Sequence, residues 1–437
     1  MESFGERTPR ALVISGASSS SGKTTIACGL LRALNNRGLS FCAYKTGPDY
    51  IDTEYLRQAG KCEAYNLDTW LMNEDSTREL FATTSYDKDL VIIEGAMGLY
   101  DGDTNSTASI AKLLGVPVVL VINAKSIGES AAALAYGFRE YDKDINLAGV
   151  ILNNVGSDSH EKIITEALNR VGVKCFGALR RNDEFAIPER HLGLITSIEN
   201  KAFDFESLAL EIEARIDLDE LIQRAAPQSF YDPHPPALMK FSCGAAYHVA
   251  VARDEAFSFY YPESLEALKN LGASLEFFSP LHDKVLPEAD IYIFGGGFPE
   301  IFESQLRENL SMIKSVRHCN KKIYAECGGL MYLCKNLAGV IPFTFTMTDK
   351  PVIGYIEARA LRDNIICGKD TLIRGHEFHY SRVEPEFHEN TCAFELTRPK
   401  TGSKYFGGYA NGNILASYLH VNFFGNIALA KNLLNKN

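Results

Sequence analysis

The first half of the chain alternates short apolar runs with longer segments of helical periodicity. Six runs are almost continuously apolar and each predicts a buried strand: Ala11–Ser15, Leu39–Lys45, Asp89–Glu94, Pro117–Asn123, Leu147–Asn153 and Val173–Leu179. Between them, stretches such as Lys23–Arg37 and Ser159–Val171 carry apolar residues at helical spacing, and Phe203–Arg224 closes the series. Continuous apolar strands joined by helices predict a doubly wound, mainly parallel α/β sheet covered on both faces.

The pattern breaks at residues 225–236, where four prolines fall within twelve residues. Proline has no backbone N–H and cannot continue a helix or a central strand, so this segment predicts a linker. The strand–helix rhythm restarts at His248–Ala252 and becomes richer in strand and turn residues between about 351 and 416. We therefore expect a first domain over 10–225, a linker over 226–246 and a second α/β domain over 247–437.

Composition argues against several classes of protein. The 437 residues include 55 acidic and 44 basic ones, a net charge of −11, which disfavours a general binder of nucleic acid or of membrane surfaces. Ten cysteines contain no Cys-x-x-Cys pair, so zinc ribbons and thioredoxin-like chemistry are disfavoured. The first ten residues do not resemble a signal peptide and no apolar run reaches membrane-spanning length. We expect a cytoplasmic protein with reduced thiols and small-molecule substrates.

A phosphate-binding loop follows the first predicted strand. Residues 16–24 read Gly-Ala-Ser-Ser-Ser-Ser-Gly-Lys-Thr, and small residues before a helix let backbone N–H groups surround an anion. Lys23 is expected to reach the β- and γ-phosphates of ATP, and the Thr24 hydroxyl to bind Mg²⁺. Five residues, rather than the usual four, separate the two glycines, so Ala17 stands where the first glycine belongs. The expected nucleotide contacts are Gly16, Ser21, Gly22, Lys23, Thr24 and Thr25.

Polar residues also gather at the ends of later strands, where an open α/β sheet binds its ligands. Lys45–Asp52 places Lys45, Asp49 and Asp52 around a Gly-Pro turn, which could equally be a turn with solvated acids. Glu94 ends an apolar strand and is costly to bury without a cation, so Mg²⁺ held by Thr24 and Glu94 would explain it. Asn153 could contact the adenine of ATP, or could belong to the N-terminal turn of a helix.

The second half carries a candidate cysteine nucleophile. Cys327 lies between a predicted strand and a helix with glycines after it, the layout of a nucleophile elbow with an exposed, reactive thiol. His420 could accept the thiol proton, and the N–H groups of Gly297 and Gly328 could form an oxyanion hole. In Arg374–Tyr380 two histidines are three apart without a cysteine nearby, so a structural or substrate-facing role is expected there instead of a metal site.

Both halves resemble the cobyrinate a,c-diamide synthase family over essentially the whole chain. The loop at 16–24 is similar to that of dethiobiotin-synthetase-like P-loop enzymes, and five further segments look like family signatures: Lys45–Asp52, Glu94–Gly102, Pro188–Leu194, Ala252–Tyr260 and Gly375–Arg382. The related cobyric acid synthase shares the two-domain plan, but the segment Gly47–Asp52 is similar to the a,c-diamide branch. Nickel-sirohydrochlorin a,c-diamide synthase stays an alternative.

The resemblance implies a P-loop synthetase domain followed by a class I-type glutamine amidotransferase domain. In such an enzyme ATP converts the a and c acetate carboxylates of a tetrapyrrole polycarboxylate to acyl phosphates, with Mg²⁺ bound by Thr24, Glu94 and Asp49. Lys45, Asp49, Asp52 and Asp101 would organise phosphate, metal and substrate. Cys327 and His420 would release ammonia from L-glutamine, and the ammonia would complete the amide.

One residue departs from the wider class of amidotransferases. Class I enzymes place a glutamate two residues after the catalytic histidine, whereas Asn422 stands there in this chain. The resemblance therefore implies a Cys–His dyad with modest glutaminase activity. A protein of a different class, a P-loop ATPase switch whose second domain only binds partners, predicts no chemistry at Cys327. The oligomeric state is left open.

Overall fold

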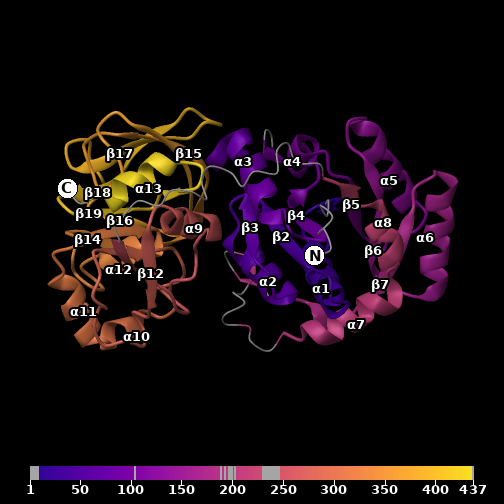
Figure 1. Cartoon of the computed structure of the whole chain (residues 1–437), viewed down its shortest axis with the longest axis horizontal. Coiled ribbons are helices and arrows are strands. Elements are labelled where there is room, and N and C mark those ends of the chain that lie inside the picture. Colours follow the sequence, from indigo (N-terminus) through magenta and orange to yellow (C-terminus); the bar gives the residue numbers. More distant parts are fainter. Residues whose placement is uncertain are drawn as a thin grey trace, which may run out of the picture. The chain divides into compact units, whose positions relative to one another are not determined.

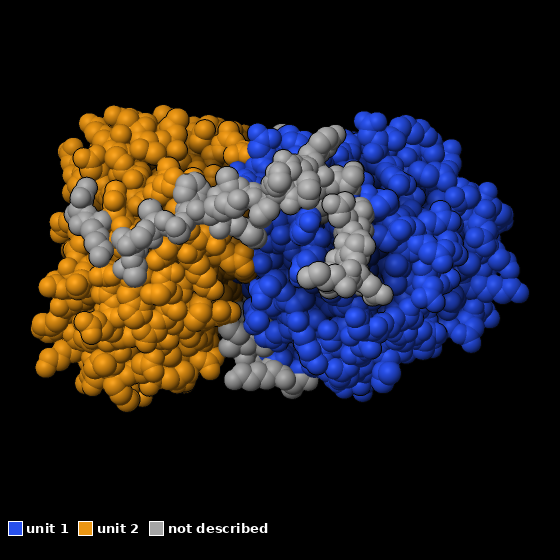
Figure 2. Space-filling model, in the orientation of Figure 1, with its two compact units in different colours: residues 1–69, 74–234 blue, residues 70–73, 235–437 orange. Residues whose placement is uncertain are grey.

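The computed structural model describes residues 9–102, 105–187, 189–190, 193–194, 200, 203–228 and 247–435. Residues 229–246 of the expected linker, and Pro188, His191 and Leu192 of the expected family segment, lie outside these ranges. The chain divides into two compact units, coloured separately in Figure 2: residues 1–69 with 74–234, and residues 70–73 with 235–437. Each unit has its own sheet and its own core.

The first unit is built on a parallel sheet of strand order β3-β2-β4-β1-β5-β6-β7 (Figure 1). Its strands are β1 (Arg10–Gly16), β2 (Phe41–Thr46), β3 (Ala64–Leu67), β4 (Leu90–Gly98), β5 (Val118–Asn123), β6 (Leu147–Val155) and β7 (Cys175–Arg180). The predicted doubly wound α/β fold is confirmed. Because β1 and β4 lie side by side with β2 next to β4, the residues that follow these three strands share one sheet edge.

Helices connect these strands as the periodicity predicted. They are α1 (Lys23–Asn36), α2 (Tyr50–Gly60), α3 (Thr69–Ser85), α4 (Thr107–Leu114), α5 (Ser130–Tyr141), α6 (Asp158–Arg170), α7 (Phe205–Arg215) and α8 (Leu218–Arg224). Helix α1 packs against α2 and α7, and α5 packs against α6. The amphipathic stretch Phe203–Arg224 forms two helices, because Ile216 is extended and the Asp217 side chain caps the first turn of α8.

Ala226 and Pro227, which we assigned to the linker, form the short strand β10 (Ala226–Pro227). This strand pairs antiparallel with the first two residues of β1, Arg10 and Ala11. The proline is tolerated because the pairing extends over only two residues, after which the backbone N–H of Gln228 donates to the Pro9 carbonyl oxygen.

The second unit has a mixed sheet in which a parallel half continues into an antiparallel half. The parallel half is β12 (Ala273–Phe278), β11 (Tyr247–Ala252), β13 (Ile291–Phe294), β14 (Lys322–Glu326) and β19 (Ile414–Ser417). The antiparallel half follows as β18 (Lys404–Asn411), β17 (Cys392–Thr397), β15 (Thr344–Ala360), β16 (Leu372–Glu384) and β20 (His420–Val421). The latter half accounts for the strand-rich composition expected from about residue 351.

The core of the second unit lies beneath the turn between β14 and α12 (Gly328–Leu333). The rings of Phe257 and Phe294 lie 5.5 Å and 5.4 Å from the ring of Tyr332. The remaining helices are α9 (Pro262–Asn270), α10 (Glu303–Glu308), α11 (Leu310–Arg317) and α13 (Ile427–Leu434). Within the described ranges no helix is long and apolar enough to cross a lipid bilayer.

Four residues from the sequence of the first unit, Trp70–Asn73, belong to the second. The Trp70 indole N–H donates to the Gly375 carbonyl oxygen at 3.2 Å, and the Arg374 guanidinium lies 4.7 Å from the indole ring centre. Leu71 and Met72 are buried. Helix α3 is interrupted at Asn73, whose φ of 66° and ψ of 171° turn the chain out of helical geometry. The sequence pattern did not predict this segment of unit two.

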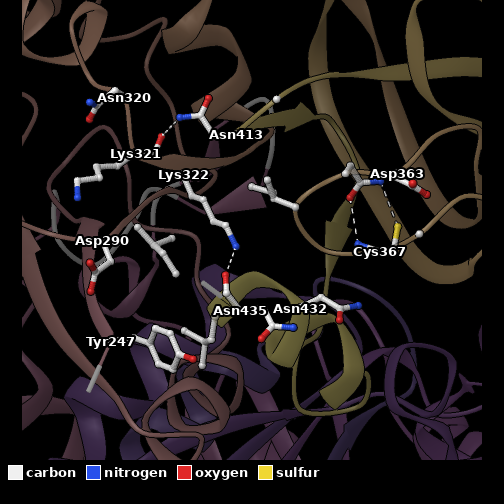
Figure 3. Close-up of a pocket in the computed structure, with 16 residues that line it drawn as sticks. Tyr247, Asp290, Asn320, Lys321, Lys322, Asp363, Cys367, Asn413, Asn432 and Asn435 are labelled. Carbon is white, nitrogen blue, oxygen red and sulfur yellow. Dashed lines mark hydrogen bonds between the residues drawn. The ribbon is translucent and has the colours of Figure 1, made fainter. Parts of the chain in front are cut away.

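A cavity of about 860 Å³ opens at the amino ends of the parallel strands of the second unit (Figure 3). Its polar lining is engaged locally: the Lys322 ammonium donates to the carbonyl oxygens of Leu433 and Asn435, and Asn413 donates to the Lys321 carbonyl. The lining includes the first residues of β11, β13 and β14, whereas Cys327 follows the last residue of β14. The cavity is therefore separate from the candidate cysteine site.

Candidate active sites

The loop between β1 and α1 has the strained backbone of a phosphate-binding loop. Gly22 caps α1 with φ 89°, and Ser20 has φ 56°. The side-chain amide of Asn153, at the end of β6, donates to the Ser21 carbonyl at 3.1 Å. A Cβ at Gly22 would lie 2.0 Å from that amide nitrogen, so only glycine fits both the conformation and the space. Asn153 thus contacts the loop itself, and its role toward adenine stays a prediction.

Two polar side chains at the end of the loop, those of Ser21 and Lys23, are buried. Lys23 is only 7% exposed, and its Nζ donates to the Ser18 carbonyl at 3.4 Å. Burial and the nearby charge of Lys45 lower the pKa of Lys23. The Ser21 hydroxyl lies against Gly16 and has no hydrogen-bond partner among the described residues. Thr25 instead donates to the Phe185 carbonyl at 3.4 Å, away from the loop's own backbone.

A compact charge cluster lies at the carboxyl edge of β2 and β4. Lys45 and Glu94 are register partners on these strands, and the Lys45 Nζ is 3.0 Å from Glu94 Oε1 and 2.6 Å from Asp52 Oδ2. The Thr24 hydroxyl donates to Glu94 Oε1 at 2.6 Å. Although burial opposes its charge, the carboxylates of Asp52 and Glu94 raise the pKa of Lys45. Burial raises the pKa of Glu94.

The other two predicted carboxylates hold turns. Asp49 caps α2 by accepting from the N–H groups of Ile51 and Asp52, and burial together with the charge of Asp52 raises the pKa of Asp49 to about 7. Asp101 accepts from the Gly98 N–H at 3.0 Å and closes the turn after β4. The Asp52 carboxylate, three residues after Asp49, accepts from the Thr24 hydroxyl at 3.3 Å. Asp49 as a metal ligand stays a prediction.

The cluster offers the donor set that Mg²⁺ uses. Glu94 Oε2 is buried and has no hydrogen-bond partner in the described part of the chain, while Oε1 meets Thr24 and Lys45. No group of three or more histidine, cysteine or acidic residues arranged for a metal occurs among the described residues. Mg²⁺ commonly takes only one or two protein carboxylates and completes its shell with water and phosphate oxygens, so Thr24 and Glu94 fit.

In the second unit Cys327 occupies a strained turn between β14 and α12. Its backbone has φ 48° and ψ −104°, and its N–H donates to the Ser417 carbonyl at 2.8 Å. This is the geometry predicted for a nucleophile elbow. The expectation of an exposed thiol is wrong, because Cys327 is only 3% exposed. Its Sγ lies 3.5 Å from the Phe378 carbonyl oxygen of β16, an element that covers it.

His420 is brought to Cys327 by the neighbouring strand. Strand β19 pairs with β14, and the chain then turns into β20, where His420 is completely buried. Burial opposes the charged imidazole, but the Cys327 thiolate and its hydrogen bond, together with Glu326, raise the pKa of His420 to about 10. The protonated imidazole of His420 is therefore favoured.

The two predicted oxyanion-hole glycines lie side by side. A Cβ on Gly328 would be 3.1 Å from the Gly297 nitrogen, and Gly297 itself has φ 152°. A side chain at Gly297 would meet the Ala256 carbonyl at 2.1 Å, so glycine is required there. The loop is also held by Tyr260, whose hydroxyl accepts from the Gly295 N–H at 2.9 Å. Next to it, Gly296 lies against the His420 ring.

Two neighbours of His420 were not predicted. Glu326 Oε2 lies 3.3 Å from His420 Nδ1, and the His376 ring stacks on the His420 ring at 4.7 Å. Asn422, the residue at the usual position of the third group, instead donates to Glu263 Oε1 at 2.8 Å. The sequence did contain an indication of Glu326. A carboxylate that ends a buried strand directly before the nucleophile needs a hydrogen-bond or charged partner.

Comparison with known proteins assigns a family to each unit. Residues 12–195 match the CobQ/CobB/MinD/ParA nucleotide binding domain, and residues 248–427 match the CobB/CobQ-like glutamine amidotransferase domain. A cobyrinate a,c-diamide synthase from Dehalococcoides mccartyi is 42% identical over 97% of both chains. Proteins of the same name from Caldanaerobacter subterraneus (95% of both chains) and Methanobrevibacter smithii (96% of this chain and 98% of that one) are 42% and 38% identical.

A nucleotide-binding unit followed by an amidotransferase unit defines a glutamine-dependent amidating ligase. The 42% identity to two relatives over almost the whole chain identifies the family within this class. The chain belongs to the cobyrinate a,c-diamide synthase family.

Proposed function

We propose that the protein amidates the a and c acetate carboxylates of cobyrinate, using ATP and glutamine. A carboxylate is a poor electrophile, so the γ-phosphate of ATP is first transferred to it to give an acyl phosphate and ADP. Ammonia then attacks the acyl carbon, and inorganic phosphate leaves. Two such rounds produce the diamide. The names of these relatives support cobyrinate as the substrate.

The first unit supplies the phosphoryl-transfer site in this proposal. Lys23 binds the transferring phosphate, and the Ser21 hydroxyl and the loop N–H groups bind its neighbours. Thr24 and Glu94 would hold Mg²⁺, which neutralises phosphate charge when bound. Lys45, clamped between Asp52 and Glu94, places a positive charge where the substrate carboxylate must approach ATP. Asp101 and Asp49 keep the flanking turns in place.

The second unit supplies ammonia. His420 accepts the Cys327 proton, and the thiolate attacks the side-chain amide carbon of glutamine. The Gly297 and Gly328 N–H groups stabilise the oxyanion, and His420 returns the proton to the departing ammonia. Water then hydrolyses the glutamyl thioester, which releases glutamate and restores the thiol.

The observation that carries the proposal is the strained turn that aims Cys327 at His420 beside two adjacent glycine N–H groups. The test is to incubate the protein with glutamine, ATP, Mg²⁺ and cobyrinate, and to measure glutamate, ADP and amide. Cys327→Ala is expected to abolish glutamate release while excess ammonia still supports amidation. Equal glutamate release by the alanine variant would contradict the assignment of Cys327, whereas a parent protein that releases no glutamate would favour a P-loop ATPase switch.

The macrocycle is tested in the same assay. Cobyrinate, hydrogenobyrinate and nickel-sirohydrochlorin are supplied in parallel with ammonia as the nitrogen source, so that only the synthetase site is compared. The proposal expects the highest kcat/KM with cobyrinate. A higher kcat/KM with nickel-sirohydrochlorin would instead favour a nickel-sirohydrochlorin a,c-diamide synthase.

A further inference from the structure

The imidazole of a cysteine amidotransferase needs a partner on its second nitrogen. In this chain the side chain of Asn422, two residues after His420, donates to Glu263 instead. Another residue must therefore contact the second nitrogen of His420. The group that faces His420 Nδ1 is the carboxylate of Glu326, 3.3 Å away and 94 positions earlier in the chain. It comes from the strand that carries the nucleophile.

Glu326 is held rigidly in this position. Its other oxygen, Oε1, accepts from the backbone N–H of Val421 at 3.1 Å and from the hydroxyl of Tyr324. The residue is 8% exposed. Because Val421 directly follows His420, one carboxylate bonds both the imidazole and the adjacent backbone. A carboxylate with both oxygens committed in this way has little freedom to turn away.

We propose that Glu326 is the positioning residue of the glutaminase reaction, replacing the missing glutamate after the histidine. It accepts the His420 Nδ1–H hydrogen bond, which keeps Nε2 toward Cys327, and its negative charge stabilises the imidazolium that forms when the thiol loses its proton. The proton moves only between Cys327, His420 and the leaving ammonia. The inference rests on the proposed glutaminase function.

Other groups near His420 cannot substitute for this carboxylate. His376 stacks on the imidazole, and its Nε2 lies 2.6 Å from the Tyr261 hydroxyl. Burial and the charge of His420 lower the pKa of His376, so it remains neutral. His379 also faces the site and is neutral for the same reason of burial. A second buried carboxylate near His420 is Glu377, but its Oε2 accepts from the Tyr405 hydroxyl and lies 3.6 Å from the Arg398 guanidinium, and burial raises its pKa.

The decisive variant is Glu326→Gln, which keeps the size of the side chain and an oxygen for the Val421 N–H but removes the charge. We expect glutaminase kcat to fall about 10- to 100-fold, with the KM for glutamine within about twofold of the parent. We also expect the alkaline limb of the pH profile of kcat/KM to move to lower pH, since the imidazolium loses its counter-charge. Tyr324→Phe, which releases one tether of Glu326, is expected to give a smaller fall in kcat.

Two controls separate positioning from folding. Glu263→Gln removes another buried carboxylate of the same unit, one that contacts Asn422, and is expected to keep kcat within about twofold. Ammonia-dependent amidation is measured for every variant and is expected to stay at the parental rate. If Glu326→Gln also loses ammonia-dependent amidation, Tyr324→Phe and Glu326→Asp are compared with the parent instead. An unshifted alkaline limb of the kcat/KM profile in both variants would overturn the proposal.

Failure of the two proposals gives different results. A parent protein that releases no glutamate contradicts the proposed function. A parent that does so, with a Glu326→Gln variant of equal kcat and unchanged pH profile, contradicts the positioning role alone.

Discussion

The ammonium group of Lys45 lies 2.6 Å from the carboxylate of Asp52, with both side chains almost excluded from solvent. The same ammonium is 3.0 Å from Glu94. One buried cation therefore compensates two carboxylates at the edge of the first sheet, and Thr24 completes the arrangement. In the proposed function, stability and phosphoryl transfer therefore depend on the same side chain.

Lys45→Met is expected to lower the free energy of unfolding of the first unit by about 3–5 kcal/mol, because it leaves buried carboxylates uncompensated. The measurement is urea unfolding followed by far-UV circular dichroism. Lys112→Met is the matched control, since its ion pair with Asp142 is partly exposed and should cost less than about 1 kcal/mol. Equal effects of the two substitutions would refute the structural role of Lys45.

Gly22→Ala is expected to abolish nucleotide binding, because the new Cβ would clash with the Asn153 amide and φ is positive. Binding of a fluorescent ATP analogue measures the effect. Adding Asn153→Ala removes the clash but leaves the backbone strain, so the double variant should recover only part of the affinity. Wild-type affinity in the single variant would contradict the packing of the loop.

The free energy of unfolding of the second unit is expected to fall as the pH drops from about 6.5 toward 3. Burial lowers the pKa of His379 to about 3, whereas an unfolded histidine titrates near 6.5, so the unfolded state binds more protons in this range. The contribution of His379 at pH 5 is about 2 kcal/mol relative to pH 7. His379→Gln should flatten the dependence and the exposed control His318→Gln should not.

Trp70→Ala is expected to destabilise the second unit by about 2 kcal/mol, although Trp70 lies within the first unit's stretch of sequence. The indole packs against Tyr355, with ring centres 5.6 Å apart, and against Arg374. Trp70→Phe retains a ring and loses only the hydrogen bond to Gly375, so its cost should be smaller. Thermal unfolding of the full chain provides the comparison, and an unchanged second unit would exclude the packing role.

The parallel sheet of the first unit and its loop could be predicted because each depends on a local pattern. Continuous apolar runs gave six strands within a few residues of their bounds, but β3 was missed, since Ala64–Leu67 is too short to show a period. The choice between Asp49 and Asp52 depended on the rotation of α2, which spacing alone does not determine. Both residues were named, and the structure separates their contacts.

The relationships that sequence could not provide are all long-range. Nothing in the residues around Trp70 indicates Gly375 as a partner, because the contact depends on how the second unit is completed. The low exposure of Cys327 likewise results from β16 crossing over it, and local sequence indicates only the turn. Glu326 was visible as a buried acid, but its partner lies on another strand.

The segment Trp70–Asn73 also decides how the protein can be observed. Trp70 is the chain's single tryptophan, and it is seated in the second unit. Intrinsic tryptophan emission therefore reports the state of the amidotransferase half, while the nucleotide half is silent at that wavelength. A fragment beginning at residue 247 would lack both this tryptophan and the other residues of the segment Trp70–Asn73 that pack in the second unit.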